Sequence, residues 1–270
     1  MNKDSNFWKS QSEVFDLASD YYDKFRPSYP QELINCIITQ SGIDTNSRIL
    51  EIGAGSGKAT ELFVNKGFNM YCIEPGENLA EVALKKFRPT CLVKYCTCRL
   101  EDWEEKKEYF DLAISAQAFH WVPKPIGFLK CASALKPKGF IGLFWNLYLT
   151  YNEQIDAELS ETRMFLLQSQ ESCEERIKSH IEEIKSSGCF KEAVVYRFPW
   201  SQRYTADEYI GFMKTCNGYL SVNENDKQAA EVKVREIINR YGGFIVRQYL
   251  CVLFLAQKRQ FISNSLFTTN

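Results

Sequence analysis

Short apolar runs alternate with amphipathic stretches along the first half of the chain. Leu33, Ile34, Ile37 and Ile38 follow helical spacing, and Gly42 stands where such a helix would end. The same reasoning predicts helices over residues 30–40, 58–66 and 77–87 and strands over residues 48–53, 70–74, 91–96, 110–115 and 140–145. The pattern therefore indicates an α/β protein in which strands and helices alternate.

These predicted strands are continuous apolar runs rather than alternations of apolar and polar residues. Such runs are typical of parallel strands that helices cover on both faces. Because crossover connections are right-handed, the expected fold is a doubly wound, Rossmann-like sheet. Ligands of such folds bind beyond the carboxyl ends of the strands, and here the turn after Ile52 is the expected place.

The second half of the chain has a different pattern. Charged helical stretches over residues 153–170 and 174–186 precede apolar runs at 193–198 and 250–256, which we interpret as strands that complete the sheet. Two further helices are expected between them, near residues 206–215 and 227–241. The charged runs are interpreted as solvated helix faces.

Domain organisation follows from these elements. No linker rich in proline, serine or glycine divides the 270 residues, so one domain is expected over 1–270. Within it we expect an N-terminal lid (1–30), a cofactor-binding core (31–146), helical insertions (147–190 and 201–246) and final strands (191–200 and 247–257).

Composition narrows the classes of partner. A net charge of −1 gives no general attraction to nucleic acid or anionic lipid. No signal peptide or membrane-spanning run is found, so a cytoplasmic protein that binds neither nucleic acid nor membrane is expected. The ten cysteines are expected to be reduced thiols, and the spacing of Cys91, Cys96 and Cys98 lacks a zinc-binding pattern, so no metal is expected.

The turn after the first predicted strand carries the clearest motif. Residues 51–57 read E-I-G-A-G-S-G, with Glu51 two positions before the first glycine. The dinucleotide fingerprint would need its third glycine at Lys58, and Glu51 would repel a pyrophosphate. S-adenosylmethionine has no phosphate and carries an ammonium and a sulfonium, so the motif favours this cofactor.

Acidic residues also follow the next two predicted strands. Glu74 stands where a carboxylate can accept hydrogen bonds from ribose hydroxyls, a position shared with nicotinamide enzymes. Leu100, Glu101 and Asp102 follow the third strand and are placed to reach an adenine ring; a solvated turn is the alternative for the two acids.

Several segments together resemble the class I S-adenosylmethionine-dependent methyltransferases, in particular the branch of trans-aconitate methyltransferases and related small-molecule enzymes. The resemblance covers most of the chain and rests on the segments Y-D-K-F-R-P-S-Y-P (22–30), the glycine motif, Glu74, A-Q-A-F-H-W (116–121) and L-K-P-K-G (135–139). Lys138 stands where the family commonly has glycine, which puts no functional residue in doubt.

This resemblance implies a seven-stranded sheet whose last strand is antiparallel, and it implies roles for site residues. It places Gly53, Gly55 and Gly57 along the methionine part of the cofactor, Glu74 at the ribose, Leu100 and Glu101 at the adenine, and Ala116 and Gln117 near the methyl group. We also expect cofactor contacts from Tyr22, Arg26, Glu51, Ala54 and Pro75.

The acceptor is expected to be a small molecule, with a carboxylate or a hydroxyl as its reacting group. His120 and Arg26 are the candidate catalytic residues, and Phe25, His120 and Trp121 the candidate walls of the acceptor pocket. His120 is interpreted as either a base or orienting group, or a structural histidine; His180 is expected at the surface. The aromatic segment 21–29 is interpreted as either a lid or a packing segment.

Two other functions stay open, namely a nicotinamide-dependent oxidoreductase and a protein that binds S-adenosylmethionine without catalysis. Either a monomer or a homodimer is compatible with the sequence. No N-P-P-Y element of base methylases follows the fourth strand.

Overall fold

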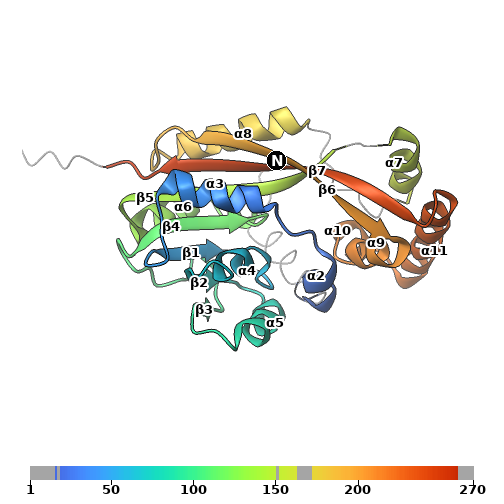
Figure 1. The fold of residues 1–270 in the computed structure, drawn as a ribbon, viewed down its shortest axis with the longest axis horizontal. Helices are drawn as coiled ribbons and strands as arrows, with labels where there is room; N and C mark the ends of the chain where they lie inside the picture. The colour runs from blue at the N-terminus through green and yellow to red at the C-terminus, as the bar shows by residue number, and fades with distance from the viewer. Residues whose placement is uncertain (1–15, 17–18, 150–151, 163–171, 261–270) are drawn as a thin grey trace, which may run out of the picture.

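A computed structural model of the chain describes residues 16, 19–149, 152–162 and 172–260. Its centre is a seven-stranded sheet in the order β3-β2-β1-β4-β5-β7-β6 (Figure 1). The strands are β1 (Arg48–Ile52), β2 (Asn69–Ile73), β3 (Val93–Cys96), β4 (Phe110–Ala116), β5 (Leu135–Leu149), β6 (Val194–Thr205) and β7 (Phe244–Gln257). Strands β1 to β5 pair in parallel, whereas β7 is antiparallel to both β5 and β6. The predicted doubly wound fold with an antiparallel last strand is confirmed.

Helices bury both faces of this sheet. On one face, α3 (Gln31–Ser41) and α4 (Lys58–Val64) share an apolar cluster with the inward side chains of β1, β2 and β4. On the other face, α6 (Ile126–Ala134) and α8 (Cys173–Ser186) pack against β5 and β7. Helix α5 (Glu77–Phe87) lies beside β3, at one edge of the sheet. Burial on both faces explains why the sequence of these strands is apolar throughout.

A group of helices, which we call the helical cap, surrounds the distal ends of β5, β6 and β7. Its members are α2 (Ser19–Phe25), α7 (Glu153–Ser160), α9 (Ala206–Met213), α10 (Asn217–Leu220) and α11 (Glu224–Arg240). Figure 1 shows β6 and β7 running beyond the central strands toward α9 and α11. A third apolar cluster, which includes Tyr204, Tyr209, Phe212 and Tyr249, joins these strand ends to the cap.

The structure corrects several predicted bounds. Strand β5 begins at Leu135 and ends at Leu149, so it is longer at both ends than the predicted strand over residues 140–145. Strand β6 continues to Thr205, into the range 201–246 expected to be helical, because it pairs with β7 along its whole length. The helix expected over 153–170 ends at Ser160, and residues 163–170 lie outside the described part of the chain.

Helix α6 was not predicted. Gly127, Phe128, Cys131, Ala132 and Ala134 are all buried, so its sequence has little of the polar face that makes a helical period visible. A helix is needed at this place because β4 and β5 are parallel neighbours, and parallel strands are joined by a crossover connection.

Candidate functional site

The turn between β1 and α4 is built by three glycines in the left-handed region of backbone conformation. Gly53, Gly55 and Gly57 have φ angles of +66°, +56° and +83°. A Cβ on Gly53 would clash with Ala118, and one on Gly57 would clash with the ring of Phe87. A Cβ on Gly55 would meet only Tyr22, at 3.8 Å. Gly53 and Gly57 therefore serve close packing within the protein, whereas Gly55 faces open space where a ligand can approach.

Glu74 fixes this turn from the end of β2. Its side chain is 6% exposed, and its two carboxylate oxygens accept hydrogen bonds from the amides of Gly55 (2.7 Å) and Gly76 (2.8 Å). Burial raises the pKa of Glu74 to about 7, although these two hydrogen bonds act to lower it. Each carboxylate oxygen keeps a further lone pair for a ligand hydroxyl.

Glu51 is a second buried acid, located on β1 beneath the same turn. It is 1% exposed and accepts a hydrogen bond of 2.6 Å from the hydroxyl of Thr60 on α4. Burial raises its pKa to about 8, against the effect of the Thr60 hydrogen bond, and the nearby Glu74 raises it further. Two acids with raised pKa values in one enclosed site favour a cationic ligand, because a positive charge would offset their mutual repulsion.

A cavity lies in front of the glycine turn and brings together many of the predicted residues. It is lined by the predicted Tyr22, Arg26, Glu51, Gly53, Ala54, Gly55, Ala116 and Gln117, by Pro27 and Tyr29 of the segment interpreted as a lid or a packing segment, and by Lys58 and Ala59, which were not predicted. The N-terminal segment thus lies across the carboxyl ends of β1 and β4.

Gln117 directly follows β4 and has an unusual backbone conformation. Its φ angle is +60°, a region that residues other than glycine rarely occupy. The amide of Gln117 donates to the carbonyl of Phe144 (3.0 Å), and its side-chain amide donates to the carbonyl of Asn146 (3.4 Å). Such strain is concentrated at functional sites, where the surrounding structure holds it in place.

Arg26 connects the cavity to the helical cap. Its guanidinium donates to the carbonyl of Thr215 (2.7 Å) and lies over the rings of Tyr22 and Phe212. The segment that follows is held by Asn146, whose amide donates to the carbonyl of Ser28 (2.9 Å). Sequence reasoning did not single out Asn146 or Thr60, because a polar residue at the end of a strand or inside a helix gives no local signal.

Other predicted site residues lie outside this cavity. Leu100 is 3% exposed and belongs to the core beneath β2, and the carbonyl of Glu101 accepts a hydrogen bond from Lys130. Pro75 directly follows Glu74 and is half-buried. Phe25 packs against Gly211 of α9 and stacks on Tyr21.

His120 lies after β4, in a short 3₁₀ helix, η1 (Phe119–Trp121), and is not among the residues that line the cavity, whereas Arg26 is. Its Nδ1 accepts a hydrogen bond from the indole N–H of Trp145 (3.3 Å), and its ring lies beside Trp121. The expectation that His180 lies at the surface was wrong: its side chain is 13% exposed and stacks on Trp145, with ring centroids 4.0 Å apart. The structure therefore does not bring His120 and Arg26 into one cluster.

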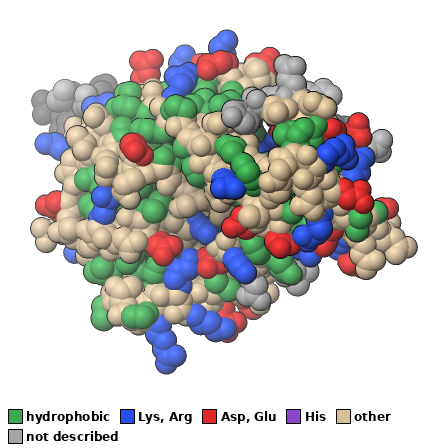
Figure 2. Space-filling model, turned by 45° about the vertical axis from the view of Figure 1, so that its right-hand side comes forward, with side chains coloured by type: hydrophobic (Ala, Val, Ile, Leu, Met, Phe, Trp, Pro, Cys, Tyr) green, Lys and Arg blue, Asp and Glu red, His purple; other side chains and the backbone are tan. Residues whose placement is uncertain are grey.

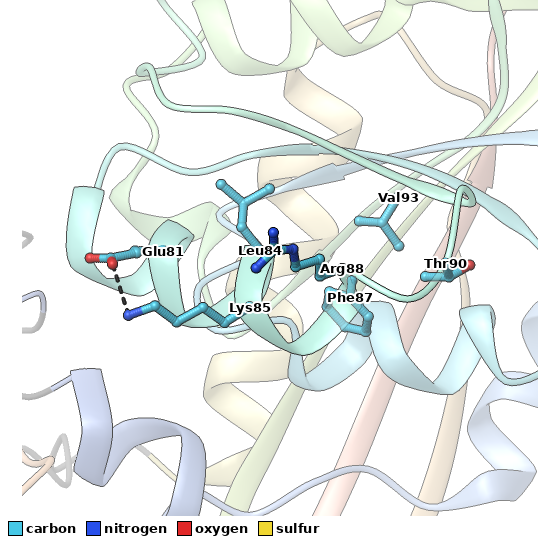
Figure 3. A pocket seen from close by; sticks show the side chains of 7 residues that line it. All are labelled: Glu81, Leu84, Lys85, Phe87, Arg88, Thr90 and Val93. Carbon is cyan, nitrogen blue, oxygen red and sulfur yellow. Dashed lines mark ion pairs between the residues drawn. The ribbon is translucent and has the colours of Figure 1, made fainter.

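A second hollow lies between α5 and the start of β3, and Figure 3 shows its lining side chains, which include Leu84, Phe87 and Arg88. Lys85 here pairs with Glu81 (2.8 Å), and both side chains are exposed, so the pair contributes little. The ring of Phe87 lies against Gly57 and so separates this hollow from the glycine turn.

Metal chemistry finds no support within the described ranges, where no group of three or more His, Cys, Asp or Glu side chains could hold an ion. In the same part of the chain, no helix is long and apolar enough to cross a membrane.

The hydroxyl of Ser56, 1% exposed within the glycine turn, has no hydrogen-bond partner among the described residues. The turn thus offers polar groups and space, with two acids that suit a cationic nucleoside better than a phosphate.

Comparison with known proteins agrees with this geometry. Residues 50–143 match the family described as methyltransferase domain. An uncharacterized methyltransferase of Mycobacterium tuberculosis is 30% identical over 51% of this chain, and the match spans 54% of that protein, about half its length.

Solved structures match over a larger share of the chain. A putative type II methyltransferase from Anaeromyxobacter dehalogenans aligns with a TM-score of 0.62 at 18% identity, over 86% of this chain and 98% of that one. Phosphoethanolamine N-methyltransferase 2 of Haemonchus contortus, solved with phosphomonomethylethanolamine and S-adenosylhomocysteine, has a TM-score of 0.56 at 16% identity, over 96% of this chain and 61% of that one. At these identities the likeness establishes the fold.

Proposed function

We propose that this chain is a class I S-adenosylmethionine-dependent methyltransferase that transfers the methyl group of S-adenosylmethionine to a small acceptor molecule, and the match of residues 50–143 to the methyltransferase domain family supports this proposal. The observation that carries this proposal is the pair of buried acids, Glu51 and Glu74, around a glycine turn whose Gly55 faces open space. The cofactor supplies a methyl group on a positively charged sulfur, which makes the methyl carbon electrophilic.

Different residues of the site would hold different parts of the cofactor. Glu74 would bind the ribose hydroxyls with the lone pairs that the amides of Gly55 and Gly76 leave unused. Glu51 would offset the positive charges of the cofactor, and Arg26 would hold its carboxylate from the wall formed by the N-terminal segment. Gln117 and Ala116, at the end of β4, would then border the methyl group.

Methyl transfer from a sulfonium is an in-line displacement, so alignment and exclusion of water are the protein's main tasks. The N-terminal segment would serve both tasks, because Tyr22 of α2 and Arg26 line the cavity and Arg26 is held by its hydrogen bond to the carbonyl of Thr215. An acceptor with a carboxylate needs no base, whereas a hydroxyl must lose a proton. We propose that the methyl group is transferred to an oxygen of a carboxylate or of a hydroxyl group on the acceptor. The resemblance to the trans-aconitate branch stays a prediction.

A small acceptor is favoured over a polymer by the surface and by the enclosed site. Lys and Arg side chains are interspersed with Asp and Glu over the face in Figure 2, whereas nucleic-acid binding relies on a continuous basic stripe. A nicotinamide oxidoreductase is disfavoured because Glu51 lies beside the position that a pyrophosphate would take and Lys58 replaces the third glycine.

Two measurements test the proposal in sequence. S-adenosylmethionine should raise the melting temperature while NAD should not, since only a ligand of the folded state stabilises it. Incubation with fractionated metabolite extracts should then release S-adenosylhomocysteine. Stabilisation by NAD alone would overturn the cofactor assignment, and binding without turnover in any extract would favour the non-catalytic alternative.

Replacement of Glu74 by glutamine should weaken S-adenosylmethionine binding by at least tenfold, or about 1.4 kcal/mol. Glutamine has the same shape but only one acceptor oxygen, so it cannot serve both amides and both ribose hydroxyls. Calorimetry measures the affinity, and circular dichroism checks the fold. Unchanged affinity in a folded variant would remove Glu74 from the cofactor site. Glu81→Gln, on the exposed face of α5, is the control and should bind normally.

A further inference from the structure

Two cysteines at the end of β3 lie in contact with each other. Strand β3 is an edge strand of the sheet and ends at Cys96 (Figure 1). The sulfur atoms of Cys96 and Cys98 are 3.3 Å apart, and both side chains are half-buried. A disulfide bond has a length of about 2.05 Å, so the two sulfurs need to approach by little more than about 1 Å to form one.

The backbone between the two cysteines brings their side chains to one side. The amide of Cys98 donates a hydrogen bond to the carbonyl of Cys96 (3.1 Å), which closes a three-residue turn directly after the strand. This turn is tighter than an extended strand and shortens the distance between the two residues. The middle residue, Thr97, is exposed, so its backbone can adjust without disturbing the core. The pair can therefore close a disulfide while β3 stays paired with β2.

The exposure of the pair allows a small oxidant to reach it. Cys72, Cys131 and Cys251 are 0% exposed and closed to solvent, whereas Cys96 and Cys98 are partly accessible. Burial raises the pKa of the Cys98 thiol to about 12, and its hydrogen bond with Cys96 acts in the same direction. Cys98 therefore stays a thiol at neutral pH, which suits the sulfur that closes a disulfide after the other sulfur has been oxidised.

One backbone hydrogen bond connects this pair to the glycine turn. The carbonyl of Cys96 accepts a hydrogen bond from the amide of Glu74 (3.1 Å) as well as the one from Cys98. The carboxylate of Glu74 in turn holds the amides of Gly55 and Gly76. The ring that a disulfide between Cys96 and Cys98 closes contains the peptide group of this same carbonyl. Formation of the disulfide therefore reorients the acceptor of the Glu74 amide.

We propose that Cys96 and Cys98 form a redox site that hydrogen peroxide oxidises to a reversible disulfide, and that this disulfide weakens cofactor binding through the amide of Glu74. One thiol takes an oxygen atom from the peroxide to become a sulfenic acid, and the first water leaves. The other thiol then attacks that sulfur, the S–S bond forms, and the oxygen leaves as a second water. The two sulfurs together lose two electrons, which the peroxide bond accepts. A dithiol reductant reverses the reaction. The effect on the cofactor rests on the proposed function.

Peptide mass spectrometry on the full chain tests the disulfide directly. Trypsin cleaves after Lys94 and Arg99, so both cysteines, and no other, fall in the peptide Y-C-T-C-R (95–99). The protein is treated with hydrogen peroxide, and the remaining thiols are alkylated before digestion. We expect the peptide without alkyl groups and two hydrogens lighter than the dithiol, and dithiothreitol should restore the dithiol. A peptide that is alkylated on both cysteines, or oxidised to sulfinic acids, would overturn the proposal.

Two variants identify the partners of the bond. Cys98→Ser should form no disulfide in this peptide. Cys91→Ser removes an exposed cysteine from the same segment and is the matched control, so its peptide should form the disulfide as the wild type does. Loss of the disulfide in Cys91→Ser would show that the pairing depends on Cys91 and would contradict the proposal.

The link to Glu74 has its own readouts. Hydrogen exchange at the Glu74 amide, followed by NMR without ligand, should be at least about tenfold faster in the oxidised than in the reduced wild type. Calorimetry should show an affinity for S-adenosylmethionine that is at least about fivefold lower after oxidation. Peroxide-treated Cys98→Ser should show neither change. Unchanged exchange or unchanged affinity in the fully oxidised protein would overturn the link. Because the peptide and exchange measurements need no ligand, absence of S-adenosylmethionine binding to the reduced protein would contradict the proposed function alone.

Discussion

Gly55→Val should abolish S-adenosylmethionine binding, with a loss of affinity of at least a hundredfold, while the ligand-free protein stays folded. The open space above Gly55 is the reason: an added Cβ would meet only Tyr22 at 3.8 Å, so the new side chain occupies the volume that the ligand needs. The φ angle of +56° is strained for any L-residue, which costs about 1–2 kcal/mol of folding stability. Calorimetry and thermal unfolding measure the two effects separately.

Gly57→Ala is the matched control, because it carries the same kind of backbone strain at a φ angle of +83°. Its Cβ would press on the ring of Phe87, so this change should cost about 1–3 kcal/mol more in stability through overpacking. We therefore expect Gly55→Val to lose cofactor binding and Gly57→Ala to lose folding stability. Near-normal affinity in folded Gly55→Val would show that the turn does not approach a ligand.

The order of strands and helices could be predicted because each element leaves a local pattern. Apolar runs over residues 48–53 and 110–115 indicated buried strands, and the structure has β1 and β4 at these places. The long outer strands could not be bounded this way: β6 continues past the apolar run to Thr205 because β7 provides its hydrogen-bond partners. Helix α6 lacked a visible period because both of its sides are largely apolar.

The candidate site was predictable where it depends on spacing along the chain. Glu51, Gly55 and Glu74 follow from the strand ends and the glycine motif, and the structure places them together. What separates Gly55 from Gly53 is the position of Ala118, which comes from a different loop. Likewise, the contact of Arg26 with Thr215 spans 189 residues, and no local pattern carries such information.

Glu51→Gln should make the stability of the ligand-free protein less dependent on pH. The pKa values of Glu51 and Glu74, about 8 and about 7, lie above their ordinary value of 4.5. The folded chain therefore binds more protons than the unfolded chain from about pH 4.5 up to the folded pKa values, so the free energy of unfolding falls as the pH rises over this range and levels off above pH 8. Glutamine at position 51 stays neutral and can still accept the hydrogen bond from Thr60.

At pH 9 we expect the free energy of unfolding of Glu51→Gln to exceed that of the wild type by on the order of 2 kcal/mol, and at pH 5 we expect almost no difference. Urea unfolding at several pH values measures it. Glu81→Gln is the control, since this exposed acid has a lowered pKa and stays ionised from pH 6 to 9. Parallel pH profiles for wild type and Glu51→Gln would contradict the assignment of a raised pKa to Glu51.

Cofactor binding should reverse this dependence and release protons. The positive charges of S-adenosylmethionine favour the ionised carboxylates, so the pKa values of Glu51 and Glu74 should fall when the ligand binds. Calorimetry at pH 7 in two buffers that differ in their heat of ionisation counts the protons released. Glu51→Gln should release fewer protons than the wild type and bind more weakly, because it has lost the charge that the cofactor attracts. Equal proton release in both proteins would show that the positive groups of the ligand do not lie close to Glu51.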